Sequence, residues 1–221
     1  MGTGVATAGR GGMVLISVGS GTSSVGGMVQ AHAGRSTVHT GGAVVVTSGE
    51  GTATSSGVVL IRSSNSGEAG VSGSLLFSSG TSVTGNSGRV HMGTGAATAG
   101  RGGAVVVTVG SGTSGSGGLV QAHAGRSTVH TGGEVHVSSG EGTATSSGAI
   151  TIRSVNAGAA GTSGYLSFSS GSSVTGNSGY IHMGTGVATA GRGGMVLISV
   201  GSGTSSVGGM VQAHAGRSTV H

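Results

Sequence analysis

The sequence predicts an all-β protein, a parallel β-solenoid (β-helix) in which each 15-residue repeat forms about one coil of two short strands. Three observations predict it. Glycines mark a fixed short period along the chain, each period holds a β-branched run bounded by glycine, and apolar character alternates with a period of two inside that run. An antiparallel array of β-hairpins is the alternative, although the chain lacks the Asn-Gly turns that favour hairpins.

The repeat unit is clearest in residues 103–117, GAVVVTVGSGTSGSG, and we number its positions 1 to 15. The step is 15 residues, or 16 where Gly67 or Gly158 is inserted. A period this short and this regular indicates one continuous repeat architecture. The units begin at Gly12, Gly27, Gly42, Gly57, Gly73, Gly88, Gly103, Gly118, Gly133, Gly148, Gly164, Gly179, Gly194 and Gly209.

A longer repeat lies above the unit. Six units make 91 residues, and residues 1–91 match 92–182 at 68 of 91 positions. Residues 183–221 then repeat 1–39 without a change. We therefore expect residues 1–221 to form a single array, with superrepeats 1–91 and 92–182 and a partial one at 183–221, cut at both ends from a longer array.

Positions 3 and 5 of the unit are the expected core. Between the two superrepeats these positions exchange only apolar residues of similar volume, as a packed interior requires. We expect the second half of the unit to return across them, with reversals at the Gly of position 8 and at the Gly or Ser of position 15. The expected core residues are Val14, Ile16, Val29, Val44, Val46, Val59, Ile61, Leu75, Phe77, Val90, Met92, Val105, Val107, Val120, Val135, Val137, Ile150, Ile152, Leu166, Phe168, Ile181 and Met183.

Positions 2 and 4 are expected to face outward. In the first superrepeat they are largely aliphatic, whereas the second has Glu134, His136, Thr151 and Ser167 at such positions. An outward aliphatic strip predicts lateral contact with another copy, or else a second layer of the chain's own fold. The residues of the predicted self-association strip are Met13, Leu15, Met28, Val45, Val58, Leu60 and Leu76.

Composition limits the other classes of function. The 221 residues include 53 Gly and only 34% hydrophobic residues, which does not suit a thick globular interior, and a disordered Gly/Ser linker is the competing interpretation. No apolar run is long enough for a transmembrane helix. The nine arginines are spread over several positions of the unit and aromatics are 2%, so we expect no nucleic-acid partner, while weak attraction to acidic polysaccharides stays open.

Residues for catalysis are scarce. Because Asp and Cys are absent and the four Glu are scattered, we expect neither an enzyme nor a cofactor. Surface solvation is the simpler explanation for the histidines, so we predict no metal site. The histidines considered as ligands are His32 and His39, their copies His123, His130, His214 and His221, and the pair His91 and His182.

Position 11 carries a second candidate function. If the coils stack, its threonines form a flat ladder similar to the surfaces of ice-binding β-solenoids, although the ladder is interrupted in every superrepeat. Ice binding, or adhesion to polysaccharide, is thus the alternative to self-association. The threonines are Thr7, Thr22, Thr37, Thr52, Thr98, Thr113, Thr128 and Thr143.

The segments GAVVVTSGEGTATSSG, SLLFSSGTSVTGNSG and GTGVATAGRGG carry a resemblance to known proteins. They resemble the Gly/Ser/Thr-rich tandem arrays of large extracellular or cell-surface proteins of diatoms and other microalgae, and the resemblance covers the whole chain. It implies a fibrous or adhesive protein outside the cell. The nine His and nine Arg depart from that pattern.

Overall fold

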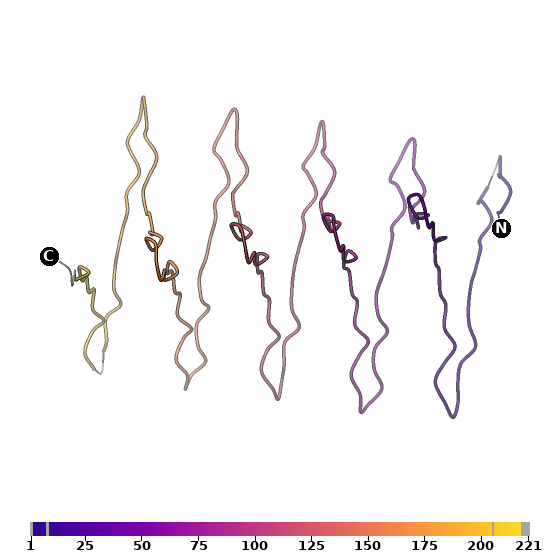
Figure 1. Cartoon of the computed structure of the whole chain (residues 1–221), viewed down its shortest axis with the longest axis horizontal. Helices are drawn as coiled ribbons and strands as arrows, with labels where there is room; N and C mark the ends of the chain where they lie inside the picture. Colours follow the sequence, from indigo (N-terminus) through magenta and orange to yellow (C-terminus); the bar gives the residue numbers. More distant parts are fainter. Residues whose placement is uncertain (1, 8, 205, 218–221) are drawn as a thin grey trace. The chain divides into compact units, whose positions relative to one another are not determined.

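The computed structural model describes residues 2–7, 9–204 and 206–217, and none of these lies in a helix or a strand (Figure 1). The predicted parallel β-solenoid is therefore wrong, and so is the array of β-hairpins, because both require backbone ladders between extended segments. The described residues use their backbone hydrogen bonds differently. Those bonds join residues three or eight positions apart, and the longer ones close a loop between one repeat and the first residue of the next.

The chain divides into two compact units, Met1–Thr108 and Val109–His221. The division falls inside the repeat 103–117 and not at the superrepeat boundary after residue 91. Each compact unit is built from the same local motif. An extended arm, which we define as positions 2–7 of the repeat, is followed by a loop, positions 8–15.

The bend of each loop lies at positions 11–13, and not at positions 8 and 15 as the sequence predicted. In the two 16-residue repeats the insertion moves it to positions 12–14. The backbone also reverses without the positive φ expected at these glycines, since among the described residues only Gly9, at a bend, has one (146°). The complete bends are residues 22–24, 37–39, 52–54, 68–70, 83–85, 98–100, 113–115, 128–130, 143–145, 159–161, 174–176 and 189–191.

A neck closes the loop at its base. We define the neck as positions 7 and 8 together with position 1 of the following repeat. In the repeat 27–41 the Gly42 amide donates to the Gly34 carbonyl at 2.8 Å, and the same bond recurs at 2.8 Å between Gly133 and Gly125. In the repeats before Gly12, Gly103 and Gly194 a threonine side chain replaces it, as where Thr94 Oγ1 donates to the Gly103 carbonyl at 3.2 Å. The remaining backbone necks are Gly27–Gly19, Gly57–Gly49, Gly118–Gly110, Gly148–Gly140 and Gly209–Gly201.

The side chain at position 7 explains why position 1 is glycine. A Cβ on Gly118 would overlap Cγ1 of Val109, and a Cβ on Gly103 would lie 3.1 Å from the Thr94 Cβ. At every starting glycine from Gly12 to Gly209 the position-7 side chain lies 3.4 Å or less from such a Cβ, and the approach is closest where position 7 is Val or Thr. By contrast, a Cβ on the position-8 glycine Gly110 would meet nothing within 4 Å. Close approach at the neck therefore favours glycine at position 1.

Position 10 fixes the path into the bend in two ways. In four described 15-residue repeats where it is serine, the hydroxyl accepts the amide of position 13, as Ser36 Oγ does from His39 at 2.9 Å. Where it is glycine, the backbone folds too closely for a side chain, since a Cβ on Gly21 would lie 2.5 Å from the Ser24 carbonyl oxygen. The serine hydrogen bond and the close backbone approach at glycine both act within one loop, so neither needs a contact with another repeat.

No described side chain is buried, so the expected core is not formed within this chain. The chain exposes 22114 Å², whereas a compact protein of its 20.4 kDa exposes about 8,800 Å². The hydrophobic burial that normally offsets chain entropy is thus absent from the single copy. Ordered loops are joined by arms that carry the chain's aliphatic side chains into solvent.

Candidate self-association surface

The arms retain the period-two alternation that the sequence predicted. Among the expected core residues, those at position 3 expose 48–62% of their area, and those at position 5 expose 58–72%. The predicted outward residues Met13, Leu15, Met28, Val45, Val58, Leu60 and Leu76 expose 71–87%. The outward residues are thus mostly more exposed than the expected core residues. Both sets are exposed to solvent, however, so neither forms an interior.

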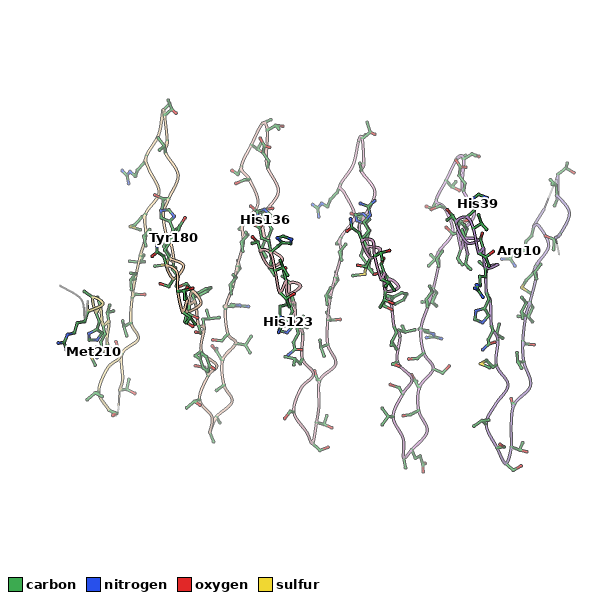
Figure 2. All side chains as sticks on the ribbon, viewed as in Figure 1. Arg10, His39, His123, His136, Tyr180 and Met210 are labelled. Carbon is green, nitrogen blue, oxygen red and sulfur yellow. The ribbon has the colours of Figure 1, made fainter. Side chains whose placement is uncertain are left out.

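The outward side chains stand away from the backbone along the arms. Tyr180 and Met210 occupy position 2 of their repeats and His136 occupies position 4, and all three project from the trace in Figure 2. Tyr180 is 88% exposed and Met210 is 72% exposed. We define the arm face as positions 2 and 4 of the arm. Its large apolar side chains are more exposed than those at position 3.

The arm face changes chemistry between the superrepeats. Val45, Leu60 and Leu76 are exposed aliphatic side chains in the first superrepeat, and the second has His136, Thr151 and Ser167 in their places. Residues 183–221 return to the first pattern, with Met195 and Leu197 exposed as Met13 and Leu15 are. The arm face is thus more polar at these positions of the second superrepeat than in the first.

The arms have unpaired main chains as well as exposed side chains. Within the described residues, main-chain hydrogen bonds occur only at the necks and between Gly161 and Gly158. The N–H and C=O groups of the arms are consequently left to water or to a partner. An extended segment with free main-chain groups and apolar side chains is a template for pairing with another chain.

The ionisable residues do not gather into a site. In the part of the chain that the structure describes, no group of three or more His, Asp or Glu could hold a metal ion, and no pocket is found. His32 lies in an arm and His39 in a bend of the same repeat, with the same placement for His123 and His130. Of the remaining histidines considered as ligands, His91, His182 and His214 lie in arms, and His221 lies outside the described residues.

The position-11 threonines also differ from expectation. Each begins a bend, as Thr22, Thr37 and Thr113 do, instead of lying in a strand. A flat ladder requires neighbouring strands to present these hydroxyls at a regular spacing, and the described residues contain no strand. The geometry that motivated the ice-binding alternative is therefore absent from them.

Sequence reasoning missed the neck. Its signal was present at position 7, where the residue is never larger than valine or threonine: Thr3, Val18, Ala33, Ser48, Ser63 and Ser79 in the first superrepeat. A small residue six positions after an invariant glycine indicates close backbone approach as well as a strand. The neck positions each arm, because the bond at its base sets where one arm ends and the next begins.

Within the described residues there is no helix with the length and apolar character that crossing a membrane requires. No family model, curated protein or solved structure matches the chain.

Proposed function

We propose that this chain is a non-enzymatic structural protein that associates with copies of itself into a fibre or filament through its aliphatic arm faces. The observation that carries the proposal is the regular recurrence of exposed aliphatic side chains on extended arms throughout the chain. Soluble monomers rarely expose apolar surface on this scale, and large exposed patches usually mark interaction sites.

The energetics support a partner. Fixing one residue's backbone costs roughly 1–2 kcal/mol, and only burial of apolar surface offsets a cost of that size over a whole chain. The single copy buries no aliphatic side chain among the described residues. Contacts with other copies would supply the missing burial, at about 1.5–3 kcal/mol for each fully covered valine or leucine.

Repetition favours an open assembly over a closed pair. An aliphatic residue stands at position 2 or 4 in five of the six repeats that begin in the first superrepeat, and the face of residues 1–39 is present again at 183–221. One copy can therefore engage several neighbours at once, and the contacts strengthen one another through effective concentration. Interfaces that do not close on themselves generate filaments.

The resemblance to surface arrays of microalgae supports an extracellular or cell-surface location as part of this proposal. In the assembly, the necks and the bends would act as spacers that hold the arms at equal intervals along the chain. The bend bonds lie within one repeat, and the neck bonds join a repeat to the first residue of the next, so assembly need not rearrange them.

Electron microscopy of the purified chain tests the proposal. We expect filaments or laterally bundled fibres to form as the concentration is raised, and we expect them to persist at high salt because the contacts are apolar. Dispersed particles at all concentrations, or assemblies that dissolve when salt is added, would contradict association through the aliphatic arm faces.

A further inference from the structure

One loop of the superrepeat carries an arginine and a histidine on a fixed backbone. We define the cationic loop as residues 34–41, which contain Arg35 and His39, together with its copy at 125–132. Gly34 and Gly42 close its base at 2.8 Å, and Gly125 and Gly133 close the copy at the same distance. The cationic loop is therefore among the most tightly closed loops of the chain.

A serine hydroxyl holds the bend of the cationic loop. Ser36 Oγ accepts the Val38 amide at 3.4 Å and the His39 amide at 2.9 Å, and Ser127 repeats both bonds at the same distances. Because these contacts use the lone pairs of the oxygen, the hydroxyl hydrogen remains free to donate outward. Ser36 directly follows Arg35 in the sequence, so the charged guanidinium donor and the neutral hydroxyl donor belong to adjacent residues.

The charge of the cationic loop is not neutralised within its repeat. Residues 27–41 contain no carboxylate, and the nearest Glu that follows is Glu50, in the next repeat. The segment 29–42 is also identical to 120–133, whereas the repeat 57–72 differs from its copy at seven positions, 58, 59, 60, 64, 66, 68 and 71. The chain therefore presents the same donor set at intervals of one superrepeat.

We propose that the cationic loops bind the oxyanions of an acidic polysaccharide, with Arg35 and Arg126 as the charged donors and the Ser36 and Ser127 hydroxyls beside them. Arginine pairs with carboxylate and sulfate oxygens through two parallel N–H groups. One exposed pair contributes little, but a polymeric anion can occupy successive loops, so the contacts add through effective concentration. The low aromatic content, 2% of the chain, removes the stacking platforms on which single-stranded nucleic acids depend.

The chain offers a matched control. Arg35, Arg126 and Arg217 are equivalent residues, and so are Arg10, Arg101 and Arg192, which precede the glycine pairs of another loop. Changing either set to Gln removes the same charge from the same number of places. The loops of the control set hold no serine cap, because Ala97 and Ala188 stand at position 10 of its second and third loops.

Binding is measured by surface plasmon resonance with the full chain at low density, against a sulfated glucan, polygalacturonate and uncharged dextran. We expect binding to one or both acidic polymers, none to dextran, and an affinity loss of about tenfold or more for the Arg35, Arg126 and Arg217 set. The control set should lose less than about threefold. The two acidic polymers distinguish sulfate from carboxylate recognition. Equal losses for the two sets, equal binding to dextran, or no binding by the unaltered chain would overturn the proposal.

Discussion

Changing Val45 to His, Leu60 to Thr and Leu76 to Ser raises the concentration needed for assembly on the order of 100-fold. The three side chains are 73–82% exposed on the arm face of the first superrepeat. Each replacement forfeits about 1 kcal/mol of apolar burial in an assembly, and about 1.4 kcal/mol corresponds to a tenfold change in an equilibrium constant. The measurement is the concentration at which light scattering by the chain begins to rise.

The second superrepeat supplies the reverse experiment. The substitutions His136→Val, Thr151→Leu and Ser167→Leu convert its arm face to the first pattern, and each introduced residue is one that the chain already places at the equivalent position. This variant should assemble at a lower concentration than the unaltered chain. If both triple variants assemble at the concentration of the unaltered chain, the arm face does not carry the association.

The second large effect is expected at a neck. The substitution Gly118→Ala should open the loop of residues 110–117, because the added Cβ would occupy the space of the Val109 Cγ1 atom. The Gly118 amide then loses its acceptor, the Gly110 carbonyl. We expect the nuclear Overhauser contact between the Val109 methyls and residue 118 to disappear.

Two controls isolate the steric cause at this neck. The substitution Gly110→Ala adds the same methyl group where nothing lies within 4 Å, so the Val109 contact should survive. The double variant Val109→Ala with Gly118→Ala removes the obstructing methyls and should restore proximity between residues 109 and 118. Loss of the contact in Gly110→Ala, or its retention in Gly118→Ala, would show that the neck is not set by close packing.

The sequence predicted a buried core at positions 3 and 5 and an outward side at positions 2 and 4, and the structure shows only a difference in the degree of exposure. Comparison of the superrepeats separated positions 3 and 5 from positions 2 and 4, and the structure exposes Val59 less than Val58 and Leu75 less than Leu76. Periodicity reports which side of an extended segment is more shielded, because alternate residues point to opposite sides. It does not report whether anything covers the shielded side.

The error lay in assigning the glycines. Gly110 was expected to reverse the chain, yet the bend lies at 113–115, and Gly110 instead supplies the carbonyl of the neck. Glycine permits a turn and also permits close approach of two segments, so its spacing alone does not distinguish them. The main-chain hydrogen bonds of the described residues lie at the bases of loops and between Gly161 and Gly158, so the arms have no ladder of the kind that a solenoid needs.

The sequence predicted part of the candidate self-association surface. Aliphatic side chains such as Met13 and Leu15 were expected to face outward, toward another copy or a second layer of the chain's own fold, and they are exposed in the structure. The expected core residues, among them Val14 and Ile16, are exposed too. Both sides of each arm are therefore available for contacts in an assembly. The predicted solenoid did not indicate this, because in it the second half of each repeat covers positions 3 and 5.

Sedimentation velocity of the unaltered chain over a wide range of concentration tests the central claim most directly. If copies supply the burial that a single chain lacks, the sedimenting mass should rise from 20.4 kDa to a broad distribution of much larger species as concentration increases. A single 20.4 kDa species that persists to the highest concentration reached would contradict the account.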